Sequence, residues 1–131
     1  MITSNKKEVK LLMRRIVVAG GRDFDNFDAM CQILDKIKWD PGDIIISGTA
    51  RGADTLGEQY ASLRNIPVAR FPARWDKYGK RAGFMRNEEM AQYATGGVIF
   101  WDGKSRGTQS MIFLMNKYRK PIKIVRYRKE N

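Results

Sequence analysis

Short β-rich runs alternate with helical segments along this 131-residue chain, and the alternation restricts the fold more than any other feature. The runs predict strands at residues 15–21, 44–47, 67–71, 97–101 and 121–125. Helical patterns lie between them at 27–38, 53–63, 82–93 and 108–118, and residues 72–81 are expected to be a loop. Strands joined through helices need right-handed crossovers, which place the strands parallel in one sheet. We therefore predict an α/β fold, a single Rossmann-like three-layer sandwich with a mainly parallel five-stranded sheet.

The net charge of +11 is concentrated in three stretches of the chain. Lysine and arginine outnumber acidic residues in 1–15, 70–86 and 117–131, whereas the remainder is net acidic. We expect residues 15–126 to form one domain, flanked by basic tails at 1–14 and 127–131. Clustered cations favour an anionic partner, and the terminal stretches suit either solvation or contact with nucleic acid.

Some classes of chemistry are excluded by residues that the sequence lacks. There is no histidine and a single cysteine, Cys31, which excludes an internal disulfide and histidine-dependent nucleophiles. Most transition-metal sites are excluded as well, so we expect no bound metal. No apolar run approaches the roughly 18 to 20 residues that span a bilayer, and the basic N-terminal stretch lacks a signal-peptide core. We therefore expect no membrane contact and a cytoplasmic location.

A glycine-rich loop, Ser47-Gly48-Thr49-Ala50-Arg51-Gly52-Ala53-Asp54, connects the second predicted strand to a helix. Glycines let the backbone approach a ligand, and the start of a helix offers unpaired N–H groups to an anion. Arg51 adds a guanidinium whose geometry suits phosphate. This loop therefore predicts an anion-binding element, with a nucleotide as the expected ligand.

Three other loops follow the carboxyl ends of predicted strands, at residues 20–23, 71–75 and 102–108. Each contains arginine, and two contain glycine. Ligands of open parallel sheets bind beyond the carboxyl ends of the strands, so we expect a composite site there. The candidate ligand-binding residues are Gly20, Gly21, Arg22, Asp23, Ser47, Gly48, Thr49, Ala50, Arg51, Gly52, Asp54, Trp75, Lys80, Arg81, Arg86, Asn87, Asp102, Gly103, Arg106, Gly107 and Thr108.

Several of these residues have two interpretations. Arg51 suits contact with a phosphate or an ion pair with a nearby aspartate, and Arg22 has the same two interpretations. Asp54 suits a helix cap or a ribose contact. Trp75, with the cations around it, suits stacking on a base or packing on the sheet edge. The catalytic residues are unknown, and the candidate acids are Glu88, Glu89 and Asp102, with a solvated helix face as the alternative for both glutamates.

The ordered set of motifs resembles a known family. Gly20-Gly21-Arg22-Asp23-Phe24, the Ser47–Asp54 loop, Phe71-Pro72-Ala73-Arg74-Trp75, Gly79-Lys80-Arg81-Ala82-Gly83, Met85-Arg86-Asn87, Gly103 and Arg106-Gly107-Thr108 occur in this order. From about Arg15 to Val125 the chain resembles the small YspA-type, YpsA-related branch of the SLOG superfamily. The resemblance implies a Rossmann-like domain that binds a nucleotide or NAD-derived phosphate ligand. It also implies a sensor of nucleotide signals, in phage or conflict-related settings, that self-associates as a dimer or higher oligomer.

Two related branches imply different activities. The Smf/DNA-processing branch has a similar loop and a similar Arg-Asn pair, and it implies binding of single-stranded DNA. The LOG branch implies hydrolysis of nucleotide N-glycosidic bonds through a glutamate that follows Gly-Thr. Here Gln109-Ser110-Met111 follow Gly107-Thr108, so that glutamate is absent. The resemblance therefore favours binding of a ligand over its hydrolysis.

Overall fold

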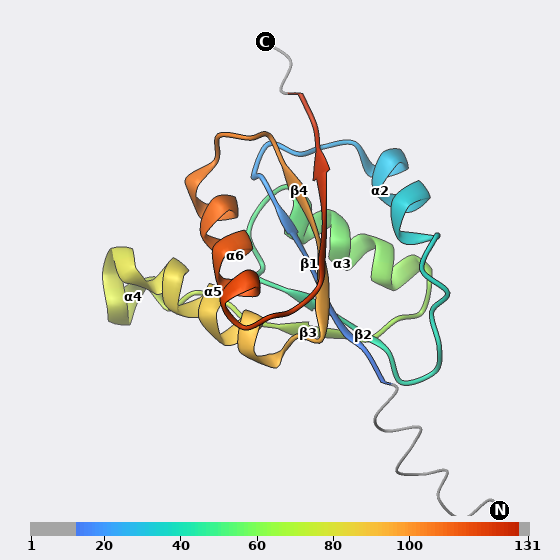
Figure 1. Cartoon of the computed structure of the whole chain (residues 1–131), viewed down its shortest axis with the longest axis horizontal. Helices are drawn as coiled ribbons and strands as arrows, with labels where there is room; N and C mark the ends of the chain where they lie inside the picture. Colours follow the sequence, from blue (N-terminus) through green and yellow to red (C-terminus); the bar gives the residue numbers. More distant parts are fainter. Residues whose placement is uncertain (1–12, 129–131) are drawn as a thin grey trace, which may run out of the picture.

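The computed structural model describes residues 13–128, which form one parallel sheet between two layers of helices (Figure 1). The strands are β1 (Arg15–Gly20), β2 (Ile44–Ser47), β3 (Val68–Arg70), β4 (Gly96–Trp101) and β5 (Ile122–Arg126). They lie in the order β3-β2-β1-β4-β5, and every neighbouring pair is parallel. The predicted α/β class and the five-stranded sheet are confirmed.

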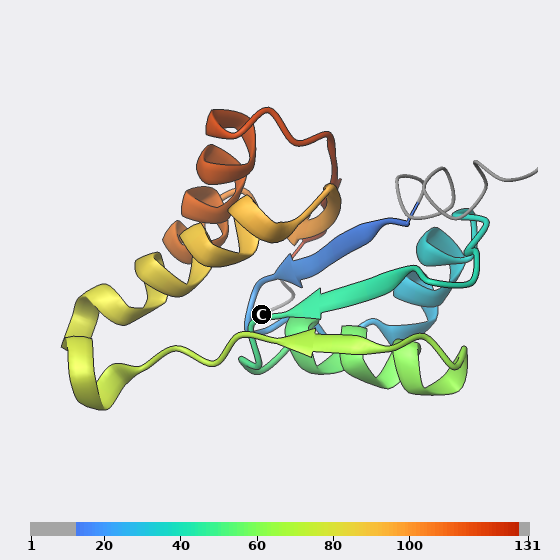
Figure 2. The same cartoon turned by 90° about the horizontal axis from the view of Figure 1, so that it is seen from below.

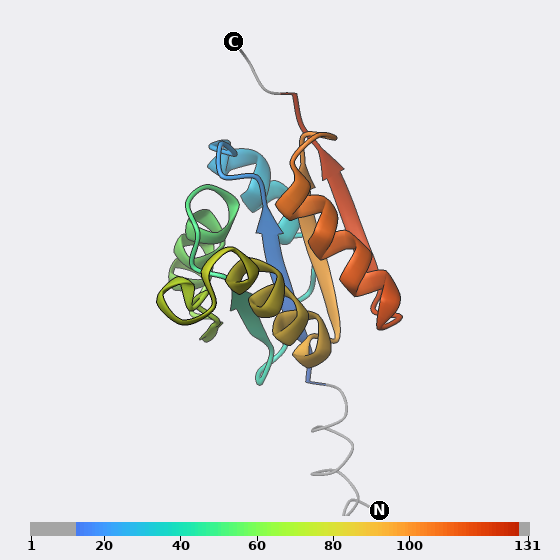
Figure 3. The same cartoon turned by 90° about the vertical axis from the view of Figure 1, so that its left-hand side faces the viewer.

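Helices cover both faces of the sheet. Successive side chains of β1 point to opposite faces, so they pack against different helices. Ile16 and Val18 pack with α2 (Phe27–Leu34) and α3 (Ala53–Leu63). Val17 and Ala19 pack with α5 (Ala82–Tyr93) and α6 (Arg106–Lys117). Figure 2 shows the two helix pairs on opposite sides of the sheet, and Figure 3 looks onto the side of α5 and α6. No helix in this described part of the chain is both long and apolar enough to cross a membrane.

Helix α2 is shorter than the predicted segment 27–38 and ends at Leu34. Asn26 caps its start by accepting a hydrogen bond from the Ala29 N–H at 3.0 Å. At the other end the Leu34 carbonyl accepts hydrogen bonds from the Ile37 N–H at 3.0 Å and the Trp39 indole at 3.1 Å. The chain therefore tightens into turns after Leu34, and the regular helix cannot continue.

Residues 72–81 contain helical structure that the sequence did not predict. Helix α4 (Trp75–Tyr78) and the 3₁₀ turn η1 (Gly79–Arg81) lead directly into α5. Figure 2 shows this segment projecting from the body of the domain. None of its residues is buried, so no apolar period marks it in the sequence.

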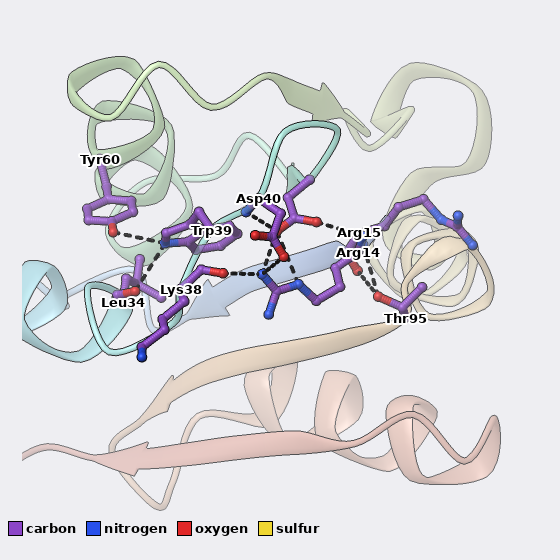
Figure 4. A network of polar contacts seen from close by, with 9 residues as sticks. Arg14, Arg15, Leu34, Lys38, Trp39, Asp40, Tyr60 and Thr95 are labelled. Atoms are coloured by element: carbon purple, nitrogen blue, oxygen red, sulfur yellow. Dashed lines mark hydrogen bonds and ion pairs between the residues drawn. The ribbon is translucent and has the colours of Figure 1, made fainter. Parts of the chain in front are cut away.

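An ion-pair network closes the amino-terminal edge of the sheet (Figure 4). Asp43 is buried, with 2% of the residue exposed. Its carboxylate accepts hydrogen bonds from the Arg14 backbone N–H at 2.9 Å and from Arg14 Nη2 at 2.6 Å. It also accepts one from the Asp40 N–H at 2.9 Å. Burial acts to raise the pKa of Asp43, but these hydrogen bonds outweigh it and hold the pKa below its ordinary value.

Two residues that the sequence assigned to basic tails contact the folded domain. Arg14 binds Asp43, and Tyr127 donates its backbone N–H to the Trp101 carbonyl at 3.1 Å. The Tyr127 ring also packs edge-on against Phe24, with ring centroids 5.0 Å apart. Residues 1–12 and 129–131 of the predicted tails lie outside the described residues.

Replacing Asp43 with asparagine is expected to lower the free energy of unfolding by about 2 kcal/mol at pH 7, because the amide cannot accept from all of these donors. Urea denaturation measures the change. The control is Asp40→Asn, whose side chain is 73% exposed and should change stability by less than about 0.5 kcal/mol. The difference in the free energy of unfolding between Asp43→Asn and the wild type should shrink as the pH falls toward the depressed pKa of Asp43. At such a pH the carboxylate of the wild type is protonated and loses its charged interaction as well. A constant loss down to acid pH would contradict this account.

Candidate functional site

A cavity of about 500 Å³ lies where the strand order reverses, beyond the carboxyl ends of β1 and β4. We call it the switch-point cavity. Its walls come from the loops after both strands, the Ser47–Asp54 loop and the inner faces of α5 and α6. It is lined by Ala19, Gly20, Gly21, Arg22, Asp23, Ala50, Asp54, Arg86, Asn87, Met90, Asp102, Ser105, Gly107, Thr108 and Met111.

Backbone contacts fix the loop after β1 against its neighbours. The Gly21 N–H donates to the Phe100 carbonyl at 3.0 Å, and the Gly21 carbonyl accepts from the Ala53 N–H at 3.1 Å. Gly52 has a φ of 77°, and a Cβ placed there would overlap the Gly21 carbonyl oxygen. Glycine is therefore required at residue 52 for the two loops to meet.

The first residue of the Ser47–Asp54 loop has a structural role. Ser47 is fully buried, and its hydroxyl donates to Glu58 Oε2 at 2.6 Å while accepting from the Thr49 N–H at 3.0 Å. Glu58 also accepts from Arg70 Nε at 2.8 Å. The Ser47 side chain, a predicted ligand contact, is thus turned toward α3 and lines no described cavity, whereas Ala50 and Asp54 line the switch-point cavity.

Asp54 is a buried carboxylate in the wall of this cavity, with 6% of the residue exposed. Its Oδ2 accepts a hydrogen bond from the Ala50 N–H at 3.0 Å. Burial raises the pKa of Asp54 to about 6, although the Ala50 hydrogen bond and the charge of Arg86 oppose the shift. The side chain therefore changes its charge near neutral pH.

Arg86 and Asn87 connect three parts of the site. Arg86 Nη1 donates to the Gly48 carbonyl, and its Nε donates to Asn87 Oδ1 at 2.9 Å. Asn87 Nδ2 donates to the Gly107 carbonyl at 3.4 Å, in the first turn of α6. Burial lowers the pKa of Arg86, although the nearby Asp54 carboxylate opposes this. The pair thus holds the Ser47–Asp54 loop, α5 and α6 together around the cavity.

A second cavity of about 380 Å³ adjoins the first, and we call it the arginine cavity. Arg22, Ala50 and Arg86 line both cavities, so the two cavities adjoin at these residues. Trp75 also lines this cavity, and 49% of the residue is exposed. The cavity is lined by Arg22, Gly48, Thr49, Ala50, Arg51, Pro72, Ala73, Trp75 and Arg86.

The loop after β4 supplies the opposite wall of the switch-point cavity. Asp102 Oδ1 accepts from the Lys104 and Ser105 N–H groups at 2.8 Å each, which lowers the pKa of Asp102. Thr108 is 5% exposed and lies 3.2 Å from Ser105, hydroxyl to hydroxyl. Gly107 and Thr108 line the cavity, whereas Gly103 and the exposed Arg106 lie outside its lining.

Other predicted residues lie away from both cavities. Lys80 and Arg81 are exposed on η1 and line neither cavity. Glu88 accepts a hydrogen bond from the Tyr118 hydroxyl at 2.8 Å and pairs with Lys117 at 3.6 Å, and Glu89 is exposed. Of the three candidate acids only Asp102 lines the switch-point cavity.

Sequence reasoning missed some of the lining residues. Met90 lies three positions after Asn87, and Met111 lies three positions after Thr108. This helical spacing places each pair on one face of its helix, and it could have identified both methionines as lining residues.

Tyr127 donates its hydroxyl to Asp23 Oδ1 at 2.5 Å, and burial together with this hydrogen bond raises the pKa of Tyr127. No local pattern connects two residues 104 positions apart.

Comparisons with known proteins agree with this architecture. Residues 14–78 match the family described as YspA, cpYpsA-related SLOG. The Gene 61 protein of Mycobacterium phage D29 is 30% identical over 107 residues, which cover 74% of this chain and 84% of that protein. A solved structure of DNA processing protein A from Helicobacter pylori, reported for its unique single-stranded DNA binding mode, has a TM-score of 0.55 and 20% identity. That match covers 93% of this chain and 70% of the other, and it concerns the fold.

Proposed function

The chain belongs to the YspA, cpYpsA-related SLOG family, and we propose that it binds a nucleotide or nucleotide-derived phosphate ligand at the carboxyl edge of its sheet. The observation that carries the proposal is the pair of adjoining cavities, joined at Arg22, Ala50 and Arg86. One is rich in arginine and the other in carboxylate, amide and hydroxyl groups, which matches a ligand with an anionic end and a neutral polar end. The proposal includes a role in sensing a nucleotide signal in a phage setting, and the similar protein of Mycobacterium phage D29 supports the phage setting.

The arginine cavity suits the phosphate. Arg22 and Arg51 are exposed at its wall, while the more buried Arg86 is held by Gly48 and Asn87. Guanidinium groups bind phosphate with charge-assisted, often paired hydrogen bonds. The start of α3 lies beside this cavity and adds the favourable end of a helix dipole.

The switch-point cavity suits the sugar and part of the base. Its polar groups include Asp54, Asn87, Asp102 and Thr108, and Met90 and Met111 supply apolar wall. A volume of about 500 Å³ falls within the range of pockets that enclose small molecules. Phosphate at the arginines and sugar at the carboxylates place one nucleotide unit across the two cavities.

Replacing Arg51 with glutamine is expected to weaken nucleotide binding by about tenfold or more, because one charge-assisted contact to the phosphate is lost. Isothermal titration calorimetry with nucleoside monophosphates, NAD and ADP-ribose measures the affinity. The control is Arg119→Gln, which removes the same charge from an exposed residue between α6 and β5, at the opposite edge of the sheet. Absence of binding by all of these compounds at millimolar concentration would contradict the proposed function, and equal losses in both variants would contradict the role of Arg51.

Single-stranded DNA is a second candidate ligand, favoured by the segment beside the arginine cavity. Trp75 lines this cavity from α4, and the exposed Lys77, Lys80 and Arg81 follow it on the projecting segment of Figure 2. An aromatic ring among cations suits stacked bases and a phosphate backbone. DNA processing protein A, which shares the fold, was studied for binding such DNA.

Fluorescence anisotropy with a labelled oligo-dT strand at several salt concentrations tests this candidate. DNA binding that falls steeply with salt and is competed by a mononucleotide would place both ligands in one site. Binding that Arg51→Gln and mononucleotides leave unchanged would contradict binding of DNA at the arginine cavity. Self-association and a cytoplasmic location stay predictions from the sequence.

A further inference from the structure

Three carboxylates line the switch-point cavity, and their hydrogen bonds differ. Asp102 Oδ1 accepts two backbone N–H groups, and Asp23 Oδ1 accepts the Tyr127 hydroxyl. Asp54 uses Oδ2 for the Ala50 N–H, while its Oδ1 receives no hydrogen bond from residues 13–128. Asp54 also forms no ion pair within 4.0 Å with a residue in that range. It therefore has a carboxylate oxygen available for a donor on a ligand.

The charges around Asp54 come from each element that packs against it. Arg86 on α5 and Arg22 after β1 favour the ionised form, while Glu58 on α3 disfavours it. Asp23 and Asp102 lie in the walls of the same cavity. Burial of Asp54 outweighs the two arginines, which leaves its pKa at about 6. At pH 7.5 the side chain is mostly an anion with 6% of the residue exposed.

A buried carboxylate discriminates strongly among the atoms of a nucleotide. It repels phosphate oxygens, and it accepts hydrogen bonds from hydroxyl or amino groups. The adjoining arginine cavity provides the anion site, so the part of the ligand that follows the phosphate reaches Asp54 first. In a nucleotide that part is the sugar.

We propose that Asp54 makes this site selective for ribose, by accepting a hydrogen bond from a hydroxyl of the sugar. The proposal rests on the proposed function and names the class of ligand within it: ribonucleotides, bound in preference to nucleotides without sugar hydroxyls. A site that contains a buried polar group rejects analogues that leave this group without a partner.

The test compares ribonucleoside monophosphates with their 2′,3′-dideoxy counterparts by calorimetry at pH 5 and pH 7.5. Both members of a pair carry the same phosphate, so the titration of the phosphate cancels in the ratio of their affinities. The wild type is expected to bind the ribonucleotide about tenfold more tightly at pH 7.5, and the ratio is expected to fall to about threefold or less at pH 5.

Asp54→Asn keeps an oxygen that can accept from Ala50 but removes the charge. Its affinity ratio is expected to be small and independent of pH. The matched control is Asp40→Asn, which removes a carboxylate that is 73% exposed at the amino-terminal edge of the sheet and lines neither cavity. This change should leave the ratio and its pH dependence in place.

The outcomes distinguish a failure of the selectivity of Asp54 from a failure of the proposed function. Equal, measurable binding of both members of a pair by the wild type would overturn the selectivity of Asp54 and leave the proposed function standing. A preference at pH 7.5 that Asp54→Asn keeps in full would also overturn it. No binding of any monophosphate at millimolar concentration would overturn the selectivity, and the absence of binding by NAD and ADP-ribose as well would overturn the proposed function with it.

Discussion

Replacing Gly52 with alanine is expected to lower the free energy of unfolding by about 3 kcal/mol or more and to abolish ligand binding. The φ of 77° at this residue disfavours any side chain. A Cβ would also lie 2.6 Å from the backbone carbon and oxygen of Arg22 and overlap the Gly21 carbonyl oxygen. Backbone atoms cannot rotate away as a side chain can, so the loop after β1 and the Ser47–Asp54 loop must separate. Both cavities take residues from these loops and would lose their shape.

Urea denaturation and calorimetry with nucleotides measure the two effects of this change. The control is Gly107→Ala, in the wall of the switch-point cavity, where the added Cβ would meet no atom of another segment within 4 Å. Because residue 107 lies in the first turn of α6, alanine there should leave stability unchanged or raise it by up to about 1 kcal/mol. A Gly52→Ala protein as stable as the wild type would contradict the required approach of the two loops.

The fold was predictable from the sequence because its signals are local. Helix α3 and strand β2 begin and end at the predicted residues, and the other strands differ from prediction by one residue at one or both ends. The period of apolar residues and the turn residues carry this information. The place of the candidate site also followed, because parallel strands bring their carboxyl ends to one edge.

Side-chain partners were not predictable, because they depend on contacts between distant elements. Ser47 looks like a ligand contact in its loop, yet its hydroxyl binds Glu58 on the next helix. The clustered cations of residues 70–86 separate in the fold: Arg86 enters the site, whereas Lys80 and Arg81 remain on the projecting segment. Sequence indicates where charge lies along the chain, and the paths of α4 and α5 decide which charges meet.

Replacing Asp54 with asparagine is expected to raise the free energy of unfolding at neutral pH. The native pKa of about 6 exceeds the ordinary value of 3.8, so the folded state binds a proton that the unfolded state has lost between these values. The free energy of unfolding therefore falls as the pH rises through this interval, and the full cost of the buried charge is present above pH 6. A difference of about two pKa units corresponds to about 3 kcal/mol, which asparagine avoids while it can still accept from Ala50.

Urea denaturation of both proteins from pH 4.5 to pH 8 measures this cost. The stability gained by Asp54→Asn should grow by about 2 kcal/mol across this range, because part of the cost is already present at pH 4.5. The control is Asp76→Asn, on the exposed surface of α4, whose stability should stay parallel to that of the wild type. Parallel curves for Asp54→Asn would contradict the raised pKa. If Asp54→Asn both stabilises the protein and removes the preference for ribonucleotides, the charge of Asp54 lowers the stability of the fold and serves recognition of the ligand.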